Sequence, residues 1–570
     1  MNFIVYSQIR EENLHSSLGL PEYSYYIVLK GFLPVLKELG QVHIVKDPEK
    51  EVDCIYDACR KRNEDCVFIT FSPPHKSTTG LRCPTFSVLA WEFSSIPEES
   101  WDNNPKNDWR TVLSDHGRLI TLSRYTVESV KKSMGENFPV AAIPSPVWDS
   151  FENFRKKTQD PHFIKPTAVT IKGNIIDSRN YRIAPDAFDL KNASDGFELR
   201  NWSGEKLRLD FSITDEARAY LGGFFEAEEW GSWSRIKEPW ILLPRRLSGS
   251  VQIKISACGY GKNIDRQIFV SLGNEKKSLR LNGFFTETDL CFQLSRPESI
   301  LKFSGLDLKP IPGAIDPRSM GIGLRYVEIM GQPDANALAV TDYENKSHRQ
   351  IQLDGVIYTS VFNPIDGRKN WEDMITAFCS AFQEVEDATL ILKMSNNSLA
   401  SFLGELHFYL QQLWPFKCRI VALQGYLDAA EYEKLIAVTD YYVNTSRCEG
   451  LCLPLMEFMS CHKPVLSPCH TAMADYMDTS SALIIKSSLE PCTWPHDSRP
   501  VFRTMRYRID WQSLVNAYQQ SYWIAKNQPE TYRQMADSAS KQIKMFASNS
   551  VVKNKLHNFL SLKLGNNFSF

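Results

Sequence analysis

The sequence predicts an α/β protein with two doubly wound domains and an all-β sandwich domain inserted between them. Residues 1–160 and 350–510 alternate short apolar runs with segments of helical periodicity, whereas residues 161–335 form short alternating runs separated by turns. The first pattern is typical of parallel sheets and the second of an antiparallel sandwich. Residues 511–570 read as helices, which we expect to pack back on the first domain.

Length and composition narrow the function classes. A chain of 570 residues is too long for one core. Its 65 Lys and Arg balance 67 Asp and Glu, which argues against a disordered chain and against an electrostatic nucleic-acid binder. Thirteen scattered Cys favour reduced thiols over a disulfide framework or a zinc site. We expect no membrane span and a cytoplasmic protein.

Each expected element follows from a local run. In the first domain, apolar strands alternate with amphipathic helices, and Gly40 ends the first helix. Ligands of such sheets bind beyond the carboxyl ends of the strands, so the residues after each strand are the candidate site. The expected strands are 2–7, 41–45, 66–72 and 117–123 in the first domain and 356–362, 388–394, 419–425, 441–444 and 464–468 in the second; the expected helices include 24–39, 53–62, 124–135 and 371–385.

Two glutamates follow the strand at 441–444. Glu449 lies in the loop and Glu457 near the start of the next helix, an E-x7-E spacing in which both side chains can face the crevice. Free N–H groups at that helix N-terminus suit a diphosphate or sugar oxygens. Alternatively, Glu449 is a solvated acid in the loop and Glu457 is an acid in the first turn of the helix, where it interacts favourably with the helix dipole. The donor-binding candidates in this stretch are Glu457, Gly450, Leu451, Cys452 and Ser446.

A polar loop follows the strand at 356–362. It contains Asn363, Arg368 and Lys369 and opens a helix. The two cations are suited to neutralise a leaving diphosphate. An Arg-Lys pair by itself is more often a solvated surface feature.

The order of strand, "GRKN" loop, helix and E-x7-E segment resembles the donor-binding domain of glycosyltransferase family 4, a group of retaining GT-B enzymes. The resemblance covers 356–478 well and 1–150 more loosely. It implies that Glu449 lies against the donor sugar, that Glu457 contacts the ribose, and that Lys369 binds the diphosphate.

The sequence departs from this family in two places. The diphosphate-binding Arg of the family is replaced by Asn363 or Pro364, so Arg368 is the expected substitute. The second small glycine of the family's "EGFG" is Cys452.

The first domain contributes further candidates at strand ends. A histidine there resembles the family residue that reaches donor sugar or acceptor, although a structural role is common for a lone His. A tryptophan next to a glutamate is suited to stack on an acceptor sugar, or is a buried aromatic beside a surface acid. The candidates are His75 for catalysis, Gly19 for the donor, and Trp91, Glu92, Ser123 and Arg124 for the acceptor.

The resemblance implies a GT-B glycosyltransferase with an acceptor domain at 1–160 and a donor domain at 350–510. It would move a sugar from a nucleotide-diphosphate sugar to a glycan or lipid-linked saccharide, with retention, in cell-surface polysaccharide synthesis of the O-antigen or capsule type. We expect no metal and no further cofactor. Two other functions stay open. One is a glycan-binding scaffold that acts through the sandwich, in which Trp230 and Trp233 either form a binding platform or belong to the core. The other is a GT-B epimerase or hydrolase.

The C-terminal helices have two interpretations. After Asp537 the chain carries five Lys and no acidic residue, which is compatible with peripheral contact to a membrane surface. The alternative is an apolar face that packs on the protein itself. The apolar residues concerned are Phe546, Leu556, Phe559 and Leu560.

Overall fold

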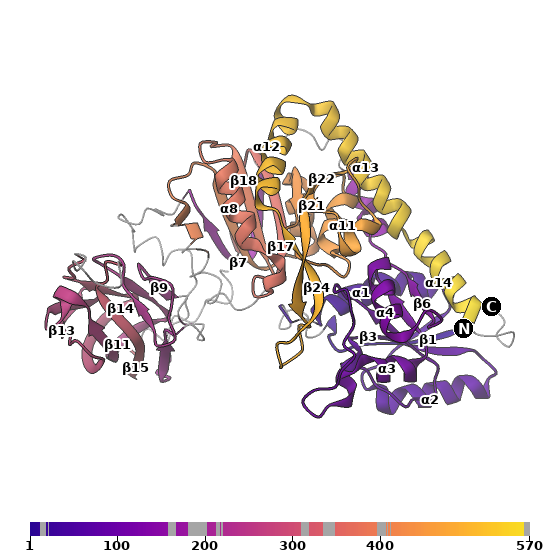
Figure 1. Ribbon diagram of the computed structural model, residues 1–570, viewed down its shortest axis with the longest axis horizontal. Coiled ribbons are helices and arrows are strands. Elements are labelled where there is room, and N and C mark those ends of the chain that lie inside the picture. Colours follow the sequence, from indigo (N-terminus) through magenta and orange to yellow (C-terminus); the bar gives the residue numbers. More distant parts are fainter. Residues whose placement is uncertain are drawn as a thin grey trace. The chain divides into compact units, whose positions relative to one another are not determined.

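The computed structural model (Figure 1) forms two compact units. Unit 1 comprises Met1–Val169, Gln352–Ser395 and Leu427–Phe570, and unit 2 comprises Thr170–Ile351 and Asn396–Tyr426. The candidate site lies in unit 1. The structure describes residues 1–11, 19–20, 22–157, 167–179, 202–212, 217, 220–308, 318–334, 348–395, 406, 409–410 and 412–563.

The first sheet of unit 1 is parallel throughout, with strand order β2-β1-β3-β4-β5-β6. Alternate residues of β1 face opposite layers: Phe3 and Val5 pack with α1, and Ile4 packs with α2. The sheet is therefore doubly wound, as the sequence predicts. Its elements are β1 (Asn2–Ser7), α1 (Tyr23–Leu39), β2 (Gln41–Ile44), α2 (Pro48–Lys61), β3 (Cys66–Phe71), β4 (Thr85–Leu89), α3 (Trp109–His116), β5 (Leu119–Thr121), α4 (Arg124–Met134), β6 (Val140–Ala142) and α5 (Glu152–Lys157).

Five parallel strands of the second α/β sheet also lie in unit 1, in the order β18-β17-β20-β21-β22. Because β17 has β18 on one side and β20 on the other, the point where the strand order reverses lies between β17 and β20. Its elements are β17 (Val356–Phe362), α8 (Trp371–Ala381), β18 (Ala388–Met394), α10 (Ala429–Val438), β20 (Tyr441–Val443), α11 (Leu453–Ser460), β21 (Val465–Pro468), β22 (Ala482–Ile485) and α12 (Trp511–Asn527).

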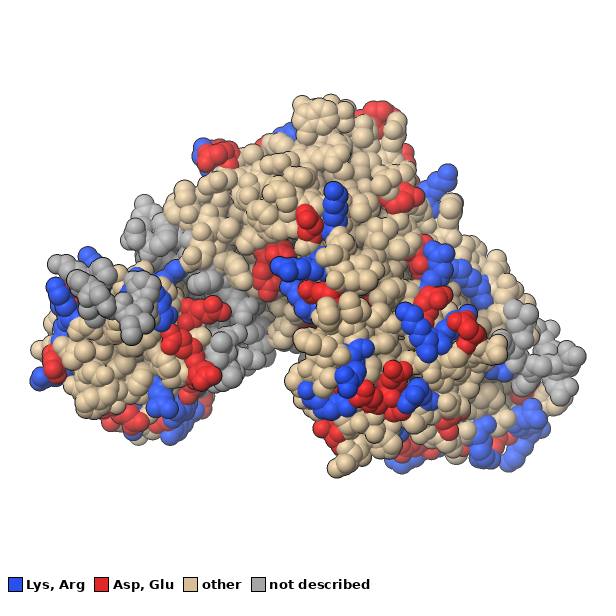
Figure 2. All heavy atoms as spheres, viewed as in Figure 1, with Lys and Arg blue, Asp and Glu red and all other residues tan. Residues whose placement is uncertain are grey.

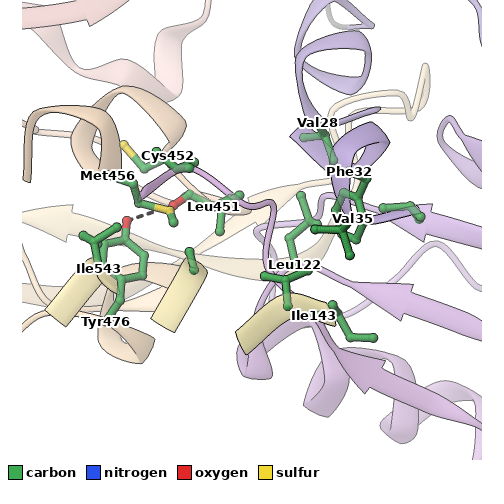
Figure 3. Packing of buried hydrophobic residues seen from close by; sticks show 14 of the residues in the cluster. Val28, Phe32, Val35, Leu122, Ile143, Leu451, Cys452, Met456, Tyr476 and Ile543 are labelled. Carbon is green, nitrogen blue, oxygen red and sulfur yellow. Dashed lines mark hydrogen bonds between the residues drawn. The ribbon is translucent and has the colours of Figure 1, made fainter. Parts of the chain in front are cut away.

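One apolar core joins the two sheets of unit 1. The last helices, α13 (Pro529–Ala547) and α14 (Asn549–Lys563), complete it: Phe559 meets Phe86 at a ring-centroid distance of 6.2 Å, and Lys553 pairs with Glu38 of α1. Figure 3 shows residues of this core that come from helices and loops of both halves of unit 1, among them Val28, Phe32, Val35, Leu122, Ile143, Leu451, Cys452, Met456, Tyr476 and Ile543.

The packing of the C-terminal helices agrees with the second interpretation from the sequence, and peripheral membrane contact stays a prediction. Leu556, Phe559 and Leu560 are buried, and Phe546 packs against the same core. The apolar face of the helices is therefore occupied by the protein itself. Across the described ranges, no helix combines the length and apolarity needed to cross a bilayer. On the face shown in Figure 2, Lys and Arg are interspersed with Asp and Glu.

A β-hairpin that the sequence analysis missed also joins the two halves of unit 1. Strands β23 (Ser487–Thr493) and β24 (Phe502–Ile509) pair antiparallel. On the connection between them, Trp494 stacks on Trp101 at 6.1 Å and donates a hydrogen bond to Ser95. Beside these contacts, Arg499 and Arg503 both pair with Glu99. We call residues 487–509 the clasp.

Unit 2 contains a large antiparallel sheet, which agrees with the inserted β domain expected from the sequence. The pairs β11–β14, β11–β15 and β12–β13 enclose an apolar core, while the two-sheet sandwich arrangement stays a prediction. The strands of this antiparallel sheet are β8 (Leu207–Asp210), β9 (Leu221–Gly222), β10 (Ser232–Trp233), β11 (Trp240–Gly259), β12 (Gln267–Leu272), β13 (Glu275–Arg280), β14 (Thr286–Ser304) and β15 (Ile322–Gln332), whereas β16 (His348–Leu353) lies beside β7 in the second α/β sheet.

One strand expected in the all-β domain pairs elsewhere. The run at 168–174 lies in β7 (Thr167–Asp177), which pairs antiparallel with β19 (Arg419–Tyr426). This strand therefore pairs outside the antiparallel sheet of β11 and β14, and the domain boundary expected at residue 161 stays a prediction. An ion pair between Arg419 and Asp177, at 2.7 Å, reinforces the pairing.

Candidate functional site

The loops that follow β17 and β20 meet where the strand order of the second sheet reverses. The loop after β17 forms a short 3-10 helix, Gly367–Lys369, and the loop after β20 carries Glu449. The N–H of Arg447 donates to the carbonyl of Arg368 at 2.8 Å, so backbone as well as side chains hold the loops together. Ligands of doubly wound sheets bind at such points.

Glu449 is the centre of the arrangement. Its carboxylate accepts from Lys369 Nζ at 2.5 Å and from Ser446 Oγ at 2.6 Å, and it lies 3.4 Å from Arg368 Nη1. Its N–H donates to Thr471 Oγ1 at 3.1 Å. Glu449 is only 4% exposed, so the carboxylate is fixed in place by partners from both loops.

Arg368 reaches three carboxylates. Its guanidinium lies 2.8 Å from Asp366, 3.1 Å from Glu92 and 3.4 Å from Glu449. Glu92 follows β4 of the first sheet, so Arg368 links the two halves of unit 1. We call Glu92, Asp366, Arg368, Lys369 and Glu449 the charge cluster.

The electrostatics of the cluster give Glu449 and Glu92 very different pKa values. Burial by itself would raise the pKa of Glu449, but the charges of Lys369 and Arg368 lower it to about 2. Burial raises the pKa of Glu92 to about 7, and Arg368 only partly opposes this. Around neutral pH Glu449 is therefore an anion, whereas Glu92 exchanges a proton.

The start of α11 lies against the first half of unit 1. A Cβ on Gly450 would lie 2.9 Å from the backbone nitrogen of Trp91, so only glycine fits there. Leu451 is buried, and its carbonyl accepts from Tyr476 at 2.8 Å. Cys452 caps α11 in the left-handed region, with φ at 63°, a conformation that favours glycine.

Glu457 contacts a different group. Its carboxylate accepts from the hydroxyl of Tyr432, on α10, at 2.6 Å, and burial raises its pKa. The two glutamates of the E-x7-E spacing therefore differ in surroundings: Glu449 is in the charge cluster and Glu457 pairs with a tyrosine. The ribose contact predicted for Glu457 stays a prediction.

Two donor-binding candidates from separate halves are brought together. Asn363 Nδ2 donates to the carbonyl of Gly19 at 2.9 Å, which joins the loop after β17 to the segment before α1. Gly19 has φ at 93°, so the turn there is one that glycine adopts without strain.

His75 lies in another group of side chains. Its ring stacks near Trp109 at 5.9 Å and lies 4.9 Å from the ring of His496. Burial, with the charges of His496 and Lys76, lowers its pKa to about 4. His75 is therefore neutral near pH 7, and its catalytic role stays a prediction.

Two acceptor candidates, Trp91 and Ser123, are buried and make structural contacts. The Trp91 ring is 3% exposed and packs between Phe93 and Trp109, so it has no free face for a sugar. Ser123 is buried and caps α4 by accepting from the N–H of Thr126. The burial of Trp91 agrees with the buried-aromatic alternative from the sequence, and the acceptor contact expected of Ser123 stays a prediction.

Arg124, the fourth acceptor candidate, pairs with the second half of unit 1. Its Nε lies 2.8 Å from Asp475, in a 3-10 helix at Thr471–Asp475, and its N–H donates to the same carboxylate. Arg124 thus helps to hold the two halves together.

His470 was missed by the sequence analysis. It is 5% exposed, and its ring stacks on Tyr507 of β24 at 4.1 Å, next to the Thr471 hydroxyl that holds Glu449. Its buried Nε2 lacks a hydrogen-bond partner in the part of the chain that the structure describes. Its place after β21 is the available signal, because it follows a strand of the same sheet.

Asp366 was also missed as a site residue, although it lies only two residues before Arg368 in the same polar loop. Its carboxylate accepts from Arg368 Nε at 2.8 Å and from the Arg368 N–H at 3.3 Å. Within the described ranges, no group of three or more His, Cys, Asp or Glu is arranged to hold a metal.

Comparison with known proteins leaves the family open. A family model described as a domain of unknown function, DUF7024, matches residues 199–331, in unit 2. No curated protein matches the chain.

Solved structures show weak similarity. A glycosyltransferase from Rickettsia africae ESF-5 is 8% identical, over 99% of this chain and 98% of that one, with a TM-score of 0.42. Sucrose-phosphate synthase from Thermosynechococcus elongatus is 16% identical, over 37% and 45%, with a TM-score of 0.27. A TarM variant from S. aureus is 12% identical, over 36% of each chain, with a TM-score of 0.27. The chain spans about a third of the length of TarM, and these scores do not establish a shared fold.

Proposed function

We propose that this protein is a glycosyltransferase that moves a sugar from a nucleotide-diphosphate sugar to a glycan or lipid-linked saccharide. The observation that carries the proposal is the meeting of Lys369, Arg368 and Glu449 where the strand order of the second sheet reverses. Two cations beside one fixed carboxylate suit a substrate with a diphosphate on one side and sugar hydroxyls on the other.

The roles follow from charge. Lys369 and Arg368 would stabilise the negative charge that develops on the departing diphosphate. Glu449, an anion near pH 7, would accept hydrogen bonds from sugar hydroxyls and stabilise positive charge on the sugar ring in the transition state. A low pKa makes Glu449 unsuitable as the acid that protonates a leaving group.

The finer assignments rest on the resemblance to glycosyltransferase family 4. They are GT-B architecture, transfer with retention, a donor site in the second half and an acceptor site in the first, and a place in cell-surface polysaccharide synthesis in the cytoplasm. Neither a metal nor another cofactor is part of the proposal.

The test is binding and transfer with a panel of nucleotide sugars. A ligand at 100 times its dissociation constant stabilises the protein by about 2.7 kcal/mol, which a melting curve detects. Lys369→Ala should abolish the shift produced by the preferred nucleotide sugar. Arg506→Ala is the matched control, because this Arg on β24 pairs with Glu490 outside the charge cluster and should leave the shift unchanged.

The outcomes separate the rival functions. Sugar transfer to an added glycan supports the proposal, and the anomeric configuration of the product, read by NMR, tests retention. Turnover without an acceptor favours an epimerase or hydrolase. A folded protein that no nucleotide sugar stabilises contradicts the proposal.

A second candidate function is glycan binding by unit 2. Trp230 and Trp233 lie 5.2 Å apart, with Phe285 and Tyr260 in ring contact beside them, and all four are half-buried. Partly exposed aromatic rings are suited to stack on sugars. Glycan binding that survives Lys369→Ala but is lost in Trp230→Ala would support this function.

A further inference from the structure

Binding of a diphosphate to the charge cluster would bring negative charges close together. Three carboxylates and two cations leave it with one net negative charge when all five groups are ionised. A diphosphate adds further negative charge to the same partly buried site, where charge repulsion is weakly screened. One carboxylate must therefore lose its charge or withdraw.

Glu449 and Asp366 are poorly placed to do so. Glu449 is held by Lys369, Arg368 and Ser446 and is the more strongly acidic of the two buried acids. Asp366 lies in the same loop as Arg368. Its carboxylate accepts hydrogen bonds from both the side chain and the N–H of Arg368.

Glu92 differs from both. It comes from the first half of unit 1, its side chain is 13% exposed, and its ion pair is with Arg368 Nη1. That same nitrogen also donates to the Cys448 carbonyl at 3.1 Å and lies 3.4 Å from Glu449. A phosphate oxygen that takes this nitrogen as its donor therefore competes directly with Glu92.

The other titratable groups around Glu92 do not supply the proton. Burial raises the pKa of Tyr25, on α1, and of Cys448, so both are neutral near pH 7. Burial would lower the pKa of Lys369, but Glu449 raises it, so Lys369 stays charged.

We propose that Glu92 takes up a proton when a nucleotide-diphosphate sugar binds, so that the ligand replaces the Glu92 carboxylate on Arg368. The proton comes from the solvent or its buffer: an O–H bond forms on Glu92 as the bond to that proton in the donor acid breaks, and no other covalent bond changes. Glu92 then remains at the site as a neutral carboxylic acid, able to donate a hydrogen bond to a phosphate or hydroxyl oxygen. The inference rests on the proposed function and adds a coupling between donor binding and pH.

Calorimetry in buffers of different ionisation enthalpy measures the proton uptake. The probes are UDP-glucose, GDP-mannose and ADP-glucose, whose diphosphate is a diester and does not itself titrate near neutral pH. With the pKa of free Glu92 at about 7, we expect uptake of about 0.9 proton at pH 8 and about 0.1 at pH 6. The affinity for the probe should fall about fivefold to tenfold as the pH rises from 6 to 8.

Three variants make the test specific. Glu92→Gln should abolish proton uptake and bind the probe with little pH dependence, whereas Glu92→Asp keeps a carboxyl group and should retain uptake. Glu99→Gln is the matched control, because Glu99 also pairs with arginines across the two halves of unit 1 but lies in the clasp contact. It should behave like the wild type. Melting curves verify that each variant is folded.

The outcomes distinguish failure of the proposed function from failure of the proposed proton uptake by Glu92. If no probe binds the wild type, the proposed function fails and this inference fails with it. If a probe binds with a heat independent of the buffer, or if Glu92→Gln still takes up a proton, the inference alone is overturned.

Discussion

The Nζ of Lys369 lies 2.5 Å from Oε1 of Glu449, so the loops after β17 and β20 share one buried ion pair. Removing a single partner of a buried pair leaves an uncompensated charge. Lys369→Met should therefore lower the free energy of unfolding by about 3 kcal/mol. Glu449→Gln added to that variant should recover part of the loss. Urea unfolding measures both, and strictly additive effects would contradict a direct pair.

The raised pKa of Glu92 predicts a pH dependence of stability. The folded protein holds this proton up to about pH 7, whereas the unfolded chain releases it near the ordinary pKa of a glutamate, 4.5. Between these values the folded state binds more protons, so this contribution to stability is full below pH 4.5 and lost as the pH rises through 7. Melting temperatures of the wild type should fall over this window relative to those of Glu92→Gln. Parallel profiles for the two proteins would argue against a perturbed Glu92.

At position 452 we expect glycine to give a more stable protein than alanine, the reverse of the usual order in a helix. In a helix, alanine is normally more stable than glycine, but φ at 63° disfavours any side chain with a Cβ. Both substitutions remove the sulfur atom, so their difference isolates the Cβ. Cys452→Gly should be more stable than Cys452→Ala by about 1 kcal/mol in urea unfolding. Equal stabilities would mean that the loop relaxes out of the left-handed conformation.

Substitution of Gly450 tests the contact between the loop before α11 and the segment that follows β4. A Cβ there would meet the Trp91 backbone at 2.9 Å, and backbone cannot move aside as a side chain can. Gly450→Ala should cost about 1–3 kcal/mol. Gly367→Ala, where nothing lies within 4 Å of the added Cβ, should be close to neutral. A neutral Gly450→Ala would show that the two halves separate easily at this point.

We expect one tryptophan of the clasp, Trp494, to contribute strongly to the free energy of unfolding. Trp494 is 1% exposed and stacks on Trp101, so Trp494→Ala should cost about 3–5 kcal/mol. Phe502 lies on the same hairpin but is 70% exposed, and Phe502→Ala should change stability little. Limited proteolysis within 487–509 gives an independent measure of whether the hairpin detaches.

Elements with a continuous buried apolar run were predictable from sequence. The strands expected at 356–362 and 388–394 have those bounds in the structure, because strands of a parallel sheet are buried on both faces. The clasp was missed because its two strands carry several polar and charged residues and no continuous apolar run, and because Trp494 has its partner Trp101 almost 400 residues away. No local pattern encodes that contact.

The candidate site was predicted unevenly for a similar reason. The glutamate loop and the Arg-Lys loop each carry a local motif, and the order of strands brings them together. The pairing of Arg368 with Glu92 depends on how two sheets meet, which no spacing reveals. The same limit explains Trp91: a strand-end aromatic has the same sequence signature whether it faces solvent or, as here, the core.

The packing of α14 has a consequence for synthesis of the chain. Phe86 of β4 meets Phe559, which the ribosome adds 473 residues later. At about 5–20 residues per second, the first sheet waits roughly 25–95 s with that part of its apolar surface uncovered. The newly made N-terminal half is therefore an expected client of chaperones until the last helix emerges.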